Sequence, residues 1–123
     1  MEPGRASEII SRSLNVLTDV SAVICTGQAD TEGAGLSSEK DFPERNLFIA
    51  GFDLSPKILQ LIKREIITCT IDQQPYLQGF LPVVQLSLYI RYGILPSNVD
   101  AGANIINRYN AGYVLNLSKK GYR

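Results

Sequence analysis

The stretch that decides the fold reads Ile66-Ile67-Thr68-Cys69-Thr70-Ile71-Asp72-Gln73-Gln74-Pro75-Tyr76-Leu77-Gln78-Gly79-Phe80. It opens as an apolar run rich in β-branched residues, which is typical of a strand. Three polar side chains follow, and Pro75 then begins a helical pattern that extends to the residue before Gly93. This order is typical of α/β sheets, which face ligands with the carboxyl ends of their strands. A capped turn between a strand and a helix is the alternative interpretation.

Similar units precede this stretch along the chain. The patterns predict a helix over residues 5–17, a strand over 20–25, a helix to about residue 39 and a strand over 47–50. Ser55 and Pro56 form a cap and first-turn pair for another helix, and a short strand is expected over 104–106. Because strands and helices alternate, the predicted fold class is α/β: a Rossmann-like parallel sheet with helices on both faces.

Polar side chains follow each of the first three predicted strands. Gln28 and Asp30 follow the first, Asp53 the second, and Asp72 with Gln73 the third. The carboxyl ends of parallel strands lie along one edge of a sheet, so these side chains are expected to form one rim. Carboxylates and amides accept and donate several hydrogen bonds at once, which suits a small hydroxylated ligand. Each residue also has a structural interpretation as a helix cap or solvated turn residue.

Composition excludes several classes of function. The 123 residues carry 12 basic and 12 acidic side chains, so the net charge offers no attraction to nucleic acid. Histidine is absent, which removes His-based catalysis and the commonest metal ligand. Cys25 and Cys69 lie far apart within apolar runs and are expected to be buried small hydrophobic residues, not metal ligands. No apolar run reaches the length of a membrane span, and the first residues do not resemble a signal peptide.

Gly51-Phe52-Asp53 and the run from Thr70 to Pro75 resemble the C-terminal lobe of type I periplasmic binding proteins. The similar branch is that of the simple-sugar, ribose- and rhamnose-type substrate-binding proteins of ABC transporters. The resemblance implies two lobes that close on a monosaccharide, with Asp53 and Gln73 bonded to ring hydroxyls. It implies weaker roles for Gln28 and Asp30, and no catalytic residue. Asp72 is a further weaker candidate, because adjacent residues on a strand end point in opposite directions. No cofactor and no metal are expected. It also implies a periplasmic protein with a membrane permease as its partner.

Family members are roughly twice as long as this chain or more. We therefore expect a fragment, with residues 1–107 as a partial C-terminal sugar-binding lobe and residues 108–123 as a solvated tail. A missing strand exposes a sheet edge and apolar helix faces, which predicts self-association. The alternative function is the effector-binding domain of a LacI-type transcription regulator. A small α/β enzyme is the third class, and the absence of histidine, of a phosphate loop and of a nucleophile elbow argues against it.

Overall fold

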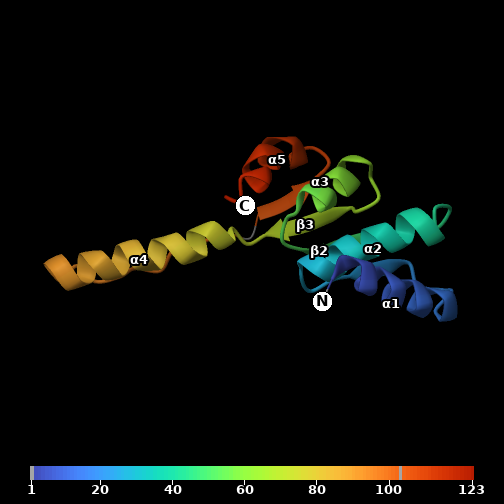
Figure 1. Cartoon of the computed structure of the whole chain (residues 1–123), viewed down its shortest axis with the longest axis horizontal. Helices are drawn as coiled ribbons and strands as arrows, with labels where there is room; N and C mark the ends of the chain where they lie inside the picture. The colour runs from blue at the N-terminus through green and yellow to red at the C-terminus, as the bar shows by residue number, and fades with distance from the viewer. Residues whose placement is uncertain (1, 103) are drawn as a thin grey trace.

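Helices and strands alternate along the residues that the computed structural model describes, 2–102 and 104–123 (Figure 1). The elements are α1 (Pro3–Val16), β1 (Ala22–Ile24), α2 (Gln28–Asp41), β2 (Phe48–Phe52), α3 (Pro56–Lys63), β3 (Cys69–Asp72), α4 (Pro75–Tyr92), β4 (Asn104–Asn107) and α5 (Ala111–Lys119). The predicted order of helices and strands up to β4 is confirmed, and the α/β class with it.

The strands form one sheet in the order β1-β2-β3-β4. The first three are parallel, as predicted, whereas β4 runs antiparallel to β3, with Asp72 opposite Asn104. The sheet is therefore mostly parallel. The reversal follows from the path of α4, because the chain comes back to the sheet at the carboxyl end of β3 and must run down beside it.

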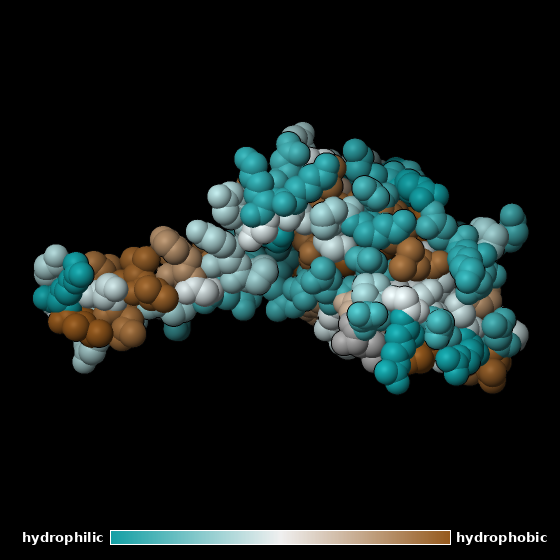
Figure 2. All heavy atoms as spheres, viewed as in Figure 1, coloured by the Kyte–Doolittle hydropathy of each residue, from teal (hydrophilic) through white to brown (hydrophobic). Residues whose placement is uncertain are grey.

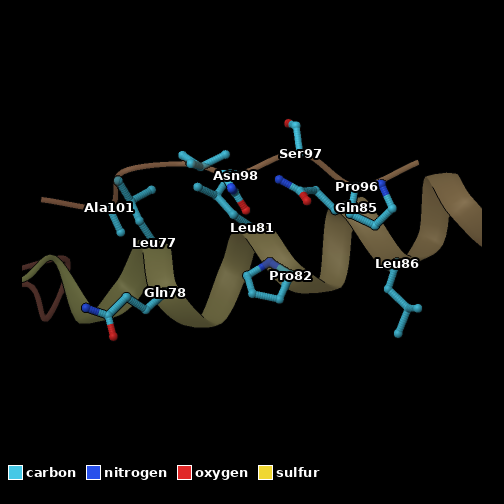
Figure 3. Close-up of a pocket in the computed structure, with 11 residues that line it drawn as sticks. Leu77, Gln78, Leu81, Pro82, Gln85, Leu86, Pro96, Ser97, Asn98 and Ala101 are labelled. Carbon is cyan, nitrogen blue, oxygen red and sulfur yellow. The ribbon is translucent and has the colours of Figure 1, made fainter. Parts of the chain in front are cut away.

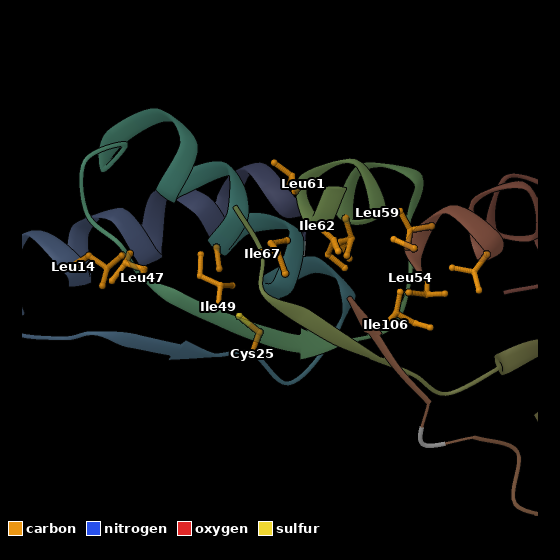
Figure 4. Close-up of a cluster of buried hydrophobic side chains, with 14 residues drawn as sticks. Leu14, Cys25, Leu47, Ile49, Leu54, Leu59, Leu61, Ile62, Ile67 and Ile106 are labelled. Atoms are coloured by element: carbon orange, nitrogen blue, oxygen red, sulfur yellow. The ribbon is translucent and has the colours of Figure 1, made fainter. Parts of the chain in front are cut away.

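The packed helices cover one face of this sheet, not both as expected. Residues of α1, α2, α3 and α5 contribute to a single core cluster (Figure 4). Right-handed crossovers that proceed in one direction, from β1 to β2 to β3, place their helices on the same face. The side chains of the other face are exposed or half-buried; they are Ala22, Ile24, Phe48, Ala50, Phe52, Cys69, Ile71, Ile105 and Asn107.

Helix α3 contributes the centre of the core. Ser55 caps it, because the backbone N–H of Ile58 donates to the Ser55 hydroxyl at 3.0 Å, and Pro56 occupies its first turn. Four side chains on one face of α3 are fully buried: Ile58, Leu59, Leu61 and Ile62. They pack against Ile49 and Ile67 beneath them, so the α3 face ties β2 to β3.

The last part of the chain folds as α5, where the sequence analysis expects a solvated tail. Ala111 and Val114 belong to the core cluster, and α5 packs against α3. Figure 1 shows α5 beside α3 over the same part of the sheet. The apolar residues at 111, 114 and 115 have helical spacing, and the short length of the run concealed it.

Helix α4 projects away from the rest of the fold (Figure 1). None of its described residues is buried, although many are apolar. Val83 is 65% exposed and Ile90 is 73% exposed. The space-filling view shows hydrophobic residues gathered over the projecting helix (Figure 2). The helix runs through Pro82 and ends at Gly93, whose φ of 69° is left-handed. Among the described helices, none is both long and apolar enough to cross a bilayer.

We predict that Gly51→Ala strongly destabilises the fold. A Cβ atom at Gly51 would lie 2.0 Å from the Thr31 Oγ1 atom, and Thr31 is fully buried. Overpacking of this kind costs about 1–3 kcal/mol, and the loss of the Thr31 hydrogen bonds adds to it. The free energy of unfolding in urea measures the effect. Gly112→Ala on α5 is the control, because a Cβ there meets nothing within 4 Å; equal stability of the two variants would contradict the packing described here.

Candidate functional site

The carboxyl ends of β1, β2 and β3 are joined by hydrogen bonds. The Thr31 hydroxyl donates to the Gly27 carbonyl at 2.6 Å and accepts from the Phe52 N–H at 3.1 Å, which ties the start of α2 to the end of β2. The Asp53 N–H donates to the Ile71 carbonyl at 2.8 Å, and so joins β2 to β3. The three strand ends therefore meet at one edge of the sheet, as the sequence predicted.

Asp53 stands at the centre of this edge. Its φ of 67° is left-handed, so the backbone turns sharply where β2 ends. The Thr70 hydroxyl donates to the Asp53 carbonyl at 2.8 Å and holds the turn. Burial, and then the negative charges of Asp72 and Asp30, raise the pKa of the half-buried Asp53 side chain. The carboxylates from the three strand ends therefore lie close enough to interact.

Asp72 is buried behind this rim. Its side chain is only 1% exposed, and its Oδ1 atom accepts from the Gln74 N–H at 2.9 Å. The Oδ2 atom lies 3.0 Å from the Arg123 Nη1 atom. That ion pair does not have hydrogen-bond geometry, so Oδ2 accepts no hydrogen bond from the described residues. Both oxygens thus face protein groups.

Gln73 and Gln74 link β3 to α4. Gln73 is half-buried, and its carbonyl accepts from the Gln78 side chain at 2.7 Å. Gln74 has a φ of 49° and a ψ of 62°, a left-handed conformation that the hydrogen bond to Asp72 supports. Gln73 therefore lies on a turn fixed by hydrogen bonds, directly after the strand that pairs with β2.

The first strand contributes Gln28 and Asp30 at the start of α2. Gln28 is exposed, and Asp30 is half-buried. The Asp30 Oδ2 atom accepts from the Thr26 N–H at 2.7 Å and from the Thr26 hydroxyl at 3.2 Å. Burial alone would raise the pKa of Asp30, but these hydrogen bonds and those of nearby backbone amides outweigh it and lower the pKa. Asp30 therefore carries a negative charge at the rim.

Both cysteines are free thiols within the described residues, with Cys25 buried and Cys69 half-buried. Burial, followed by the charge of Asp30, raises the pKa of Cys25 to about 11, which leaves it protonated at neutral pH and a poor nucleophile. No group of three potential ligands for a metal ion is found among the described residues.

Sequence reasoning missed Arg123 as a neighbour of this site. The residue follows α5, and the fold of that segment brings it back to Asp72. The Tyr122 ring makes an edge contact with Tyr76 in the first turn of α4, with ring centres 5.3 Å apart. A basic residue near the end of a polar run gave no signal of this contact, which depends on where α5 packs.

Comparison with known proteins supports a sugar-binding fold. No protein-family model matches the chain. A carbohydrate transporter protein from Acidothermus cellulolyticus, solved in complex with myo-inositol, superimposes with a TM-score of 0.84 at 26% identity, over 99% of this chain and 43% of that one. GanP, a glucose-galactose binding protein from Geobacillus stearothermophilus, superimposes with a TM-score of 0.79 at 23% identity, over 89% of this chain and 39% of that one.

The chain has the fold of one lobe of the sugar-binding proteins of ABC transporters. In sequence, it is 45% identical over 62 residues to the xylose/arabinose-binding protein XylF of Sulfolobus acidocaldarius. That match covers 49% of this chain and 15% of XylF. The chain spans less than half the length of each of these relatives. None of these three is a transcription regulator, so they favour the sugar-transport interpretation over the LacI-type one.

We predict that Asp53→Asn changes how stability depends on pH. The folded pKa of Asp53 lies above its ordinary value of 3.8. Between these two values the folded chain holds more protons than the unfolded chain, so this residue makes stability fall as pH rises. Asparagine tolerates the left-handed backbone and removes that contribution. Urea unfolding across this pH window should therefore show a less negative slope in the variant than in the original chain.

Asp19→Asn is the matched control, because Asp19 is exposed and precedes β1 at the opposite end of the sheet. It should leave the slope as it is. A slope that is the same in the Asp53 variant and in the original chain would show that neither burial nor the neighbouring carboxylates raise the pKa of Asp53.

Proposed function

We propose that this chain is part of the sugar-binding component of an ABC-type importer, with no catalytic activity. The observation that carries the proposal is that Asp53 and Gln73 follow the ends of two paired strands, on turns held by Thr70 and Asp72. A fixed carboxylate and amide together suit the alternating donors and acceptors of sugar hydroxyls. The relatives solved with myo-inositol or named for glucose, galactose, xylose and arabinose support a small polyhydroxylated ring, such as a monosaccharide, as ligand.

In this proposal, Asp53 and Gln73 contact the ring hydroxyls directly. Asp30 and Gln28 border the same edge and form its outer part. Asp72 acts from behind, because its carboxylate is buried and faces Gln74 and Arg123. The membrane permease of the transporter is the proposed protein partner, and the periplasm is the proposed location.

Helix α4 supports the idea that the functional protein has a second lobe. A fully buried large apolar side chain contributes about 1.5–3 kcal/mol, and α4 leaves many such side chains in water. The segment at 96–101 runs back along α4 and lines a shallow groove with Leu77, Leu81 and Leu86 (Figure 3). We propose that α4 and this segment pack into the part that makes the relatives longer, and that the sugar lies between the two parts.

The sugar proposal is tested by titrating the isotope-labelled chain with D-xylose, L-arabinose and myo-inositol. We expect weak binding, because only one lobe is present, with amide shifts confined to the ends of β1, β2 and β3. Asp53→Asn and Gln73→Ala should abolish these shifts, since each removes a hydrogen-bonding group from the edge. Asp19→Asn should leave them unchanged. Shifts that survive both site variants, or none with any sugar, would refute the proposed contacts.

The chain on its own should self-associate. The sequence pointed to a sheet edge and to apolar helix faces. In the structure β1 exposes Ile24, whereas α4 exposes many large apolar side chains, Val83 and Ile90 among them. We propose that two copies associate through α4. Val83→Glu should lower the association constant in sedimentation equilibrium, because it places a charge on the apolar helix. Val16→Glu on α1 is the matched control, as Val16 is 80% exposed and lies on another helix; an equal effect of both would exclude α4 as the contact.

A further inference from the structure

Residues 120–123 fold back from α5 onto the end of β3. Gly121 has a φ of 73°, a left-handed turn that reverses the chain after α5. The Tyr122 N–H then donates to the Leu117 carbonyl at 3.0 Å, and the Tyr122 ring contacts Tyr76. These contacts bring the guanidinium of Arg123 to Asp72, with Nη1 3.0 Å from Oδ2. The contact is therefore built by the fold, not by chance encounter of two surface side chains.

The buried negative charge of Asp72 requires a compensating positive charge near its Oδ2 atom. A carboxylate as deeply buried as this one is strongly disfavoured unless its charge is compensated. Its Oδ1 atom accepts one backbone N–H, while Oδ2 accepts no hydrogen bond from the described residues. Two further carboxylates, those of Asp53 and Asp30, add negative charge at the same edge of the sheet. Arg123 supplies the opposite charge, and its own side chain is only 24% exposed.

The Asp72 carboxylate in turn fixes the segment that carries Gln73. Its bond to the Gln74 N–H closes a two-residue turn around Gln73. Gly102 passes against the same turn, since a Cβ there would lie 2.9 Å from both the Asp72 carbonyl oxygen and Gln74 Nε2. Movement of the Asp72 side chain would therefore shift the Gln73 backbone directly.

We propose that Arg123 is a positioning residue for the turn at residues 72–74: it holds the Asp72 carboxylate, and Asp72 holds Gln73 in place at the strand edge. The proposal deepens the sugar-binding function, on which its consequence for affinity rests. Arg123 does not contact the ligand in this arrangement. It acts through Asp72 and Gln74, from the segment that follows α5.

The test compares Arg123→Met with Arg123→Lys in the full 123-residue chain. Methionine keeps an unbranched apolar stem but removes the charge, and lysine restores a cation. We expect Arg123→Met to shift the NMR signals of the Gln74 backbone amide and the Gln73 side-chain amide, and Arg123→Lys to restore them in part. Lys119→Met on α5 is the control for loss of one positive charge, and it should leave both signals unchanged.

A double-variant comparison separates positioning from a general loss of stability. In an Asp72→Asn background, Arg123→Met should no longer move the Gln73 and Gln74 signals, because the charge that Arg123 holds is gone. Equal shifts in both backgrounds, or no shift in the original chain, would overturn the proposal. Thermal unfolding of each variant, measured in parallel, checks that the chains remain folded.

The consequence for sugar is read in the same samples. Where the original chain responds to D-xylose, L-arabinose or myo-inositol, Arg123→Met should raise the dissociation constant about tenfold, because loss of the ion pair releases the turn that carries Gln73. An unchanged constant would overturn the link to affinity. If the original chain responds to none of these sugars, the proposed function fails, and the Gln73 and Gln74 signals still decide the role of Arg123.

Discussion

The hydroxyl of Thr31 is the contact on which the edge of the sheet depends. It lies over Gly51, where no other residue leaves room for it, and it joins the start of α2 to the end of β2 through hydrogen bonds to Gly27 and Phe52. The next residue, Asp53, continues the connection to β3 through Ile71. One side chain and one glycine thus align the strand ends that carry the polar groups.

Much of the fold was readable from local patterns. The Ser55-Pro56 pair predicted the start of α3. The order of strand, polar residues and helix around Asp72 predicted β3 and α4. The meeting of polar strand ends followed from the geometry of parallel strands alone. The direct sugar contacts of Asp53 and Gln73 remain predictions.

Other features depend on tertiary packing and left no local signal. The antiparallel direction of β4 follows from the route of the chain around α4, which the pattern at 104–106 does not encode. The one-sided arrangement of the packed helices depends on which strands are present. The apolar pattern of α5 is short, and its residues are buried because they pack against α3. The ion pair between Arg123 and Asp72 joins residues 51 positions apart, and only the fold brings them together.

The position of α4 between β3 and β4 has a thermodynamic consequence. Pairing of Asp72 with Asn104 closes an excursion of about thirty residues, whose loop-closure entropy costs about 3 kcal/mol plus a constant. A partner that holds α4 together with the returning segment at 96–101 lowers this cost, because it keeps the two ends of the excursion near each other. Docking of α4 and completion of the sheet by β4 and α5 are therefore coupled equilibria, and each favours the other to the same extent. Whether β4 and α5 are folded onto the sheet therefore depends in part on what α4 binds.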